Sequence, residues 1–122
     1  MKTKDRPQLS DLVNKGTLEP EKFQNDIIRP IIKMQHNFLI ILFKNYIIRS
    51  KIDFYNLKIE KQIEKINSIL TKDVIFKNII LGSVIGHFSD EELIFYLKDS
   101  SELKKRILQI IKQRLIDSFT LL

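Results

Sequence analysis

Residues 27–48 read IIRPIIKMQHNFLIILFKNYII and form the most apolar run in the chain. On a helical wheel, the apolar side chains of residues 31–49 occupy two neighbouring arcs. The first arc holds Ile31, Met34, Phe38, Ile41, Leu42 and Tyr46, and the second holds Ile32, Leu39, Phe43 and Ile47. A helix that is apolar on nearly every side is buried on several sides. We therefore expect residues 31–49 to be the central helix of a compact all-α bundle of five or six helices.

Pro30 interrupts this pattern. Proline has no backbone N–H and its ring clashes with the carbonyl group one turn earlier, so we expect the helix to be kinked or broken at Pro30. A membrane span is not expected, because a span needs roughly 20 mostly apolar residues. Here the uninterrupted apolar part is only residues 38–43. Lys44 follows it at once, and Arg29, Lys33 and His36 lie upstream.

Helical periodicity continues through the rest of the chain. It predicts further helices at about residues 19–30, 57–71, 73–86, 90–98 and 101–119. We expect residues 17–122 to form a single helical domain and residues 1–16 to be a mobile or loosely docked N-terminal tail. The helices at 73–86 and 101–119 are the expected neighbours of the central helix. Whether the second arc is covered by this chain or by another copy is left open.

The strongest local signal in the sequence is a capping box. Ser89 is a favoured N-cap residue, and Glu92 follows three positions later. Phe88 precedes the cap and Leu93 is the fourth helical residue, which is the spacing of a hydrophobic staple. These four residues predict a helix that begins directly after Ser89.

Two glycines, Gly82 and Gly86, lie four positions apart in the helix predicted at 73–86. Each costs about 1 kcal/mol relative to alanine in a helix, so each is expected to have a structural reason. We expect Gly82 to allow the close approach of another helix. We expect Gly86 to mark the end of its own helix, because the next N-cap follows almost at once.

Composition narrows the classes of function. The chain of 122 residues contains no cysteine, which excludes disulfides, thiolate catalysis and thiolate metal sites. The N-terminus has a charged start without an apolar run behind it, so no signal peptide is expected and the cytoplasm is the expected location. The formal net charge of +6 raises the odds of an anionic partner, although charges of both signs are interspersed along the chain.

Three residues are weak candidates for a functional site: His36, His87 and Arg114. A single histidine on an apolar helix is usually a packed boundary residue, and His87 stands beside the acidic cap of the next helix. Neither histidine belongs to a metal-binding motif such as H-E-x-x-H. Arg114 falls within the apolar face of its helix, where we expect an ion pair or a head group that reaches the edge of the bundle. No catalytic residue, metal or cofactor is expected.

A nucleic-acid interface is the alternative that the charge suggests. The basic residues of the helix at 101–119 and its approach are Lys98, Lys104, Lys105, Arg106, Lys112 and Arg114. They are scattered around the helix and mixed with acidic residues. No aromatic and basic platform for a single strand is present.

Three segments of the sequence carry a resemblance to a known family. They are EKFQNDIIRPIIKMQHNFLI at residues 21–40, FKNIILGSVIGHFSDEELIFY at residues 76–96, and SSELKKRI at residues 100–107. Together they resemble a family of small uncharacterised helical bacterial proteins, some of whose members carry the name glyoxalase. The resemblance therefore implies a glyoxalase-type enzyme as one alternative. It places no catalytic residue on this chain, because no motif here matches the His and Glu metal ligands of glyoxalase I-type enzymes.

The sequence as a whole favours a non-enzymatic interaction or structural module. Two helices, at 31–49 and 73–86, are more apolar than one small core requires. We therefore expect a protein partner, with a homo-oligomer as the simplest one. Nucleic-acid binding through residues 101–119 and a glyoxalase-type activity are the alternatives.

Overall fold

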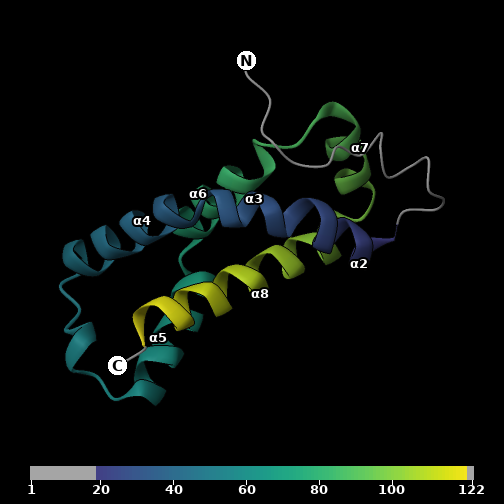
Figure 1. Cartoon of the computed structure of the whole chain (residues 1–122). Helices are drawn as coiled ribbons and strands as arrows, with labels where there is room; N and C mark the ends of the chain where they lie inside the picture. The colour runs from purple at the N-terminus through teal and green to yellow at the C-terminus, as the bar shows by residue number, and fades with distance from the viewer. Residues whose placement is uncertain (1–18, 121–122) are drawn as a thin grey trace.

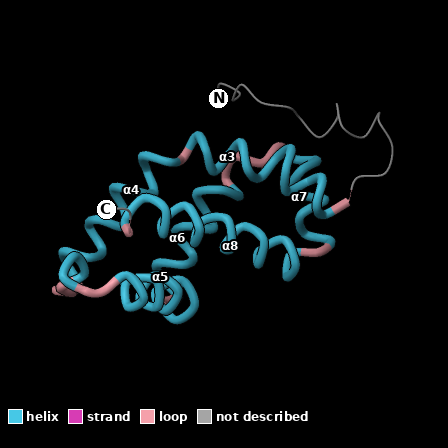
Figure 2. The backbone as a smooth tube through the Cα atoms, turned by 60° about the horizontal axis from the view of Figure 1, so that its bottom comes forward, coloured by secondary structure: helices cyan, strands magenta, loops and turns pink. Residues whose placement is uncertain are grey.

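The computed structural model describes residues 19–120, of which 85% are helical, with no strand among them. The elements are α2 (Pro20–Phe23), the π-helix η1 (Gln24–Ile28), α3 (Arg29–Met34), α4 (His36–Arg49), the 3-10 turn η2 (Phe54–Asn56), α5 (Ile59–Lys72), α6 (Val74–Ile85), α7 (Asp90–Lys98) and α8 (Ser100–Phe119). They form a compact helical bundle with short connections (Figures 1 and 2). The all-α prediction is confirmed. The predicted tail at residues 1–16 lies outside the described residues.

The chain passes through Pro30 without leaving the helical conformation. Directly before it, residues Gln24–Ile28 form a π-helical turn, and the N–H of Arg29 donates to the carbonyl of Gln24, five residues earlier. In an α-helix the ring of Pro30 would clash with the carbonyl of Asp26. The wider π-helical turn relieves that clash. The helix is therefore not broken at Pro30, and its departure from regular α-helix is the π-helical turn that directly precedes Arg29.

A second interruption, which the sequence did not predict, lies at Gln35. Its backbone angles, φ −91° and ψ 10°, separate α3 from α4. The side-chain amide of Gln35 donates to the carbonyl of Ser83 in α6 at 3.2 Å. This hydrogen bond connects the junction between α3 and α4 to Ser83, which lies 48 residues further along the chain.

The inner side of α4 is the second arc of the helical wheel. Leu39 and Phe43 are fully buried and Ile47 is nearly so. The ring of Phe43 contacts Phe119 of α8, with ring centroids 4.7 Å apart. It also contacts Phe54 in η2 and Phe76 in α6. The second arc is therefore covered by this chain itself, which answers the question that the sequence left open.

The helix with the most neighbours is α8. It contacts η1, α4, α5, α6 and α7, and Leu103, Ile107, Ile111 and Leu115 on its inner side are fully buried. The sequence placed α4 at the centre because α4 is the more apolar helix. In the structure α4 lies at the edge, where one side contacts the bundle and the other contacts solvent. The apolar composition of a helix therefore indicates how much of its surface could be buried. The packing of the neighbouring helices decides how much of that surface is buried.

Side-chain caps begin two of the helices, with Asp73 as the N-cap of α6 and Ser89 as the N-cap of α7. Ser89 and Glu92 form the predicted capping box: the N–H of Ser89 donates to Oε1 of Glu92 at 2.8 Å, and the N–H of Glu92 donates to Oγ of Ser89 at 3.2 Å. The ring of Phe88 packs against Phe23 and Tyr96. The staple contact between Phe88 and Leu93 stays a prediction.

The two glycines of α6 differ from each other. The expectation of a close helix approach at Gly82 is wrong, because a Cβ atom there would meet nothing within 4 Å. The reason is that α6 packs through its opposite side, where Ile80 and Val84 are buried. Gly86 is the C-cap of α6, as predicted. Within residues 19–120, no helix is long and apolar enough to cross a membrane.

Candidate functional site

The outward side of α4 is apolar. Phe38, Ile41 and Ile48 are 43%, 68% and 74% exposed. Their spacing of three and seven residues places them on one side of the helix. They lie away from the buried Leu39 and Phe43. Within residues 19–120, Phe38 and Ile41 of the first arc are therefore exposed together with Ile48, whereas the second arc is buried.

Helix α6 also carries exposed apolar side chains. Ile75 is 75% exposed and Ile79 is 45% exposed, and their spacing of four residues places them on one side of α6. A groove of about 310 Å³ separates the two helices. Its walls are formed by Leu42, Asn45, Tyr46, Arg49, Ser50, Asp73, Ile75, Phe76 and Ile79. We refer to Phe38, Ile41, Ile48, Ile75 and Ile79 as the α4–α6 face.

A hydrogen-bonded pair lies at the edge of this groove. The hydroxyl of Tyr46 donates to Oδ2 of Asp73 at 2.6 Å, and Oδ1 of Asp73 accepts from the N–H of Phe76 at 3.0 Å. The Phe76 N–H and the Tyr46 hydroxyl hold the pKa of Asp73 below its usual value. The same bond to Asp73, together with burial, raises the pKa of Tyr46. Asp73 therefore presents a carboxylate to the groove that Arg49 also lines.

The Asp73 carboxyl is expected to make the fold sensitive to acid. Its pKa in the folded state lies below the ordinary value of 3.8, so the unfolded chain binds this proton more readily. Stability from this group is then fully present above the unfolded pKa and is lost as the pH falls through the folded pKa. We expect the stability difference between the wild type and Asp73→Asn to be largest near neutral pH and to shrink in acid. Urea denaturation across the acid range measures it. A difference that is constant with pH would contradict the assignment.

The structure brings together two of the three candidate residues. Nη1 of Arg114 in α8 lies 3.2 Å from Nδ1 of His36 at the start of α4. Arginine has no acceptor atom, so Nδ1 of His36 is the acceptor in this contact. His87 lies in the turn between α6 and α7 and does not join this pair.

The acidic cap beside His87 has a structural role. Glu92 is fully buried and its carboxylate accepts from the backbone of Ser89. In the described part of the chain, 19–120, no group of three or more His, Asp or Glu side chains lies close enough together to hold a metal ion.

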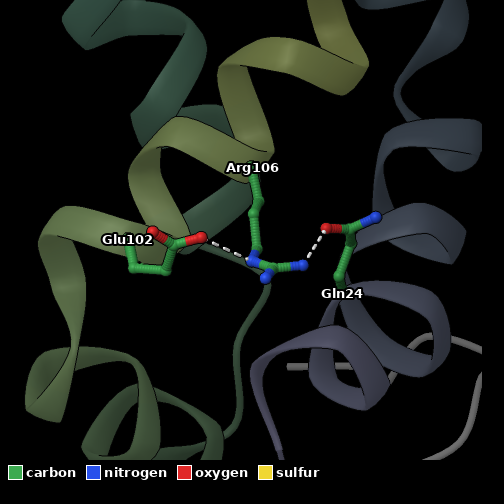
Figure 3. Close-up of polar contacts among 3 residues, drawn as sticks. All are labelled: Gln24, Glu102 and Arg106. Carbon is green, nitrogen blue, oxygen red and sulfur yellow. Dashed lines mark hydrogen bonds and ion pairs between the residues drawn. The ribbon is translucent and has the colours of Figure 1, made fainter.

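Part of the basic charge of α8 is engaged within the bundle. Arg106 turns toward η1: its Nε donates to Oε2 of Glu102 at 2.9 Å, and its Nη1 donates to Oε1 of Gln24 at 2.9 Å (Figure 3). Lys104 and Lys105 are exposed to solvent. Two of the six basic residues expected to face nucleic acid, Arg106 and Arg114, are therefore engaged within the bundle.

The sequence missed the α4–α6 face as a site. The helical pattern identified the residues of this face as apolar, and the prediction placed them in the interior of the bundle. The signal that was present is the excess of apolar positions on the helices at 31–49 and 73–86, which exceeds what one core can cover. Comparison with known proteins gives no match to a family model, to a curated protein or to a solved structure.

Proposed function

We propose that this protein is a non-enzymatic interaction module that self-associates through the α4–α6 face. The observation that carries the proposal is the exposure of five large apolar side chains on two adjoining helices whose other sides contribute to the buried core. With about 200 Å² for a fully exposed side chain of this size, the face offers on the order of 600 Å² of apolar surface. That is comparable to the roughly 800 Å² per partner of a standard interface.

A second copy is the partner that the face fits best. In a two-fold dimer the same patch serves both subunits, so it must be complementary to itself. The groove carries one cation, Arg49, and one anion, Asp73, beside its apolar walls. No ion pair joins these two residues within one chain of the described structure. A two-fold arrangement lets Arg49 reach the partner's Asp73 at both ends of a shared apolar centre.

The nucleic-acid alternative has less support. It requires several basic side chains on one accessible surface, whereas Arg106 is bonded to Glu102 and Gln24 and Arg114 to His36. In the part of the chain that the structure describes, the five side chains of the α4–α6 face are exposed. Self-association is therefore the function that the geometry favours.

Sedimentation velocity on the wild-type protein tests the proposal directly. We expect the weight-average sedimentation coefficient to rise with concentration from the value of a monomer to that of a dimer. High salt is expected to leave this rise intact, because apolar burial is not screened by ions. A strict monomer at high protein concentration would contradict self-association through this face.

A further inference from the structure

A second region of interest lies between α3 and α8. It is a cavity of about 440 Å³, and one helix supplies most of its lining. The lining residues are Arg29 of α3 and Gln109, Ile110, Gln113, Arg114, Asp117 and Ser118 of α8. Two arginines thus meet in one cavity with amide and hydroxyl groups around them. This cavity shares no lining residue with the groove between α4 and α6.

Arg114 has unused hydrogen-bonding capacity. Its Nε atom is buried and has no hydrogen-bond partner. Its Nη1 atom faces Nδ1 of His36, and no carboxylate among residues 19–120 lies within ion-pair distance. The ion pair that the sequence suggested for Arg114 is therefore not present in this part of the chain. A partly buried guanidinium without an anion is costly, since a buried charge needs a partner.

Arg29 is the second cation of the cavity. Its Nε donates to Oδ1 of Asn25 at 3.1 Å, which fixes the side chain but leaves the charge unpaired among the described residues. Arg106, in contrast, has Glu102 as its ion-pair partner. A neighbouring cavity lies between Arg29 and Arg106. Among residues 19–120, the two arginines of the α3–α8 cavity thus differ from Arg106 in having no carboxylate within ion-pair distance.

We infer that the α3–α8 cavity is a binding site for a small organic carboxylate, held by Arg114 and Arg29. The guanidinium fork presents parallel N–H donors that match the two oxygens of a carboxylate. His36 acts as a positioning residue, because its Nδ1 holds Nη1 of Arg114, while Nη2 of Arg114 and the two Nη atoms of Arg29 are left for the ligand. The volume lies within the range of small-molecule sites. The inference does not depend on self-association.

Asp117 determines which anion is preferred. It lines the same cavity and its Oδ1 accepts from Nε2 of Gln113 at 2.9 Å. Its negative charge disfavours a doubly charged phosphate more than a singly charged carboxylate. The amide of Gln109 and the hydroxyl of Ser118 suit a ligand whose body carries polar groups. A small carboxylic acid with hydroxyl or amino substituents is therefore the class that fits.

Nitrogen-edited NMR of the arginine side chains tests this site. Acetate, glycine, lactate and inorganic phosphate are titrated separately into the full-length protein, and the Nε–H resonance of Arg114 is followed. We expect this resonance to move with the carboxylates and to move less with phosphate. A larger response to phosphate would overturn the assignment of the ligand class. No movement with any of the four probes would overturn the site.

Two variants assign the response to Arg114. Arg114→Met is expected to weaken carboxylate binding roughly 10- to 100-fold, because a charge-assisted pair is removed. Lys104→Met removes one exposed positive charge from the same helix. This variant is expected to bind the carboxylates with the same affinity as the wild type. Equal weakening by both would show a general effect of charge and contradict the site. If Arg114→Met does not fold, Arg114→Lys keeps the charge without the fork and is still expected to bind more weakly.

Discussion

Phe43→Ala is expected to lower the free energy of unfolding by about 3–5 kcal/mol. Phe43 is fully buried, and its ring contacts the aromatic rings of Phe54, Phe76 and Phe119 from three different elements. Truncation to alanine removes these contacts and leaves a cavity that rigid helices cannot close. For a domain whose total stability is typically about 5–15 kcal/mol, this is a large part of the whole.

Phe38→Ala provides the matched control for this prediction. Phe38 is the same residue type in the same helix, but it lies on the outward side and is 43% exposed. We expect its truncation to cost much less, on the order of 1 kcal/mol or below. Urea denaturation at low protein concentration compares the two variants with the wild type. Similar losses for both would mean that the two sides of α4 are not assigned correctly.

Ile41→Asp is expected to weaken self-association at least about 100-fold, which corresponds to about 2.7 kcal/mol. Ile41 is 68% exposed and belongs to the α4–α6 face. In the proposed dimer a carboxylate at this position would be buried among apolar side chains without a partner, which is strongly unfavourable. In the monomer the same carboxylate stays in water, so the fold itself is expected to persist. Sedimentation velocity reports the first effect and circular dichroism the second.

Leu97→Asp is the control for the interface. Leu97 lies on α7, outside the α4–α6 face, and its exposure of 62% is close to that of Ile41. The substitution introduces the same charge on a surface of similar apolar character. We expect Leu97→Asp to dimerise as the wild type does. Dimerisation that is lost in Leu97→Asp and retained in Ile41→Asp would place the interface on α7.

Several features follow from neighbours within one or two helical turns, and these were predicted closely. The helix expected at 101–119 is present at Ser100–Phe119, because a regular apolar stripe and its N-terminal residues specify it locally. The capping box of Ser89 and Glu92 involves residues only three positions apart. Such features depend on backbone geometry that the nearby residue types determine.

Other features depend on residues far apart in the chain. The break at Gln35 coincides with a hydrogen bond from its side chain to the backbone carbonyl of Ser83. Position 35 is neither proline nor glycine, so the residue type does not predict the break. The wheel could not decide which apolar arc of α4 is buried, because both arcs are apolar. Contacts from η2, α6 and α8 to Phe43 decide it. The same limit explains why α8, with fewer apolar residues, has more neighbours than α4.

The sequence by itself determined an all-helical chain, most of its helix ends, and the absence of thiol chemistry. Hydrogen bonds and side-chain preferences within about four residues are sufficient for these properties. Only the tertiary structure decided that the outer arc of α4 faces solvent beside α6. It also placed Arg114 against His36, 78 residues earlier in the chain, in a cavity with Arg29. Long-range packing brings these groups together, and helical periodicity contains no information about which helices become neighbours.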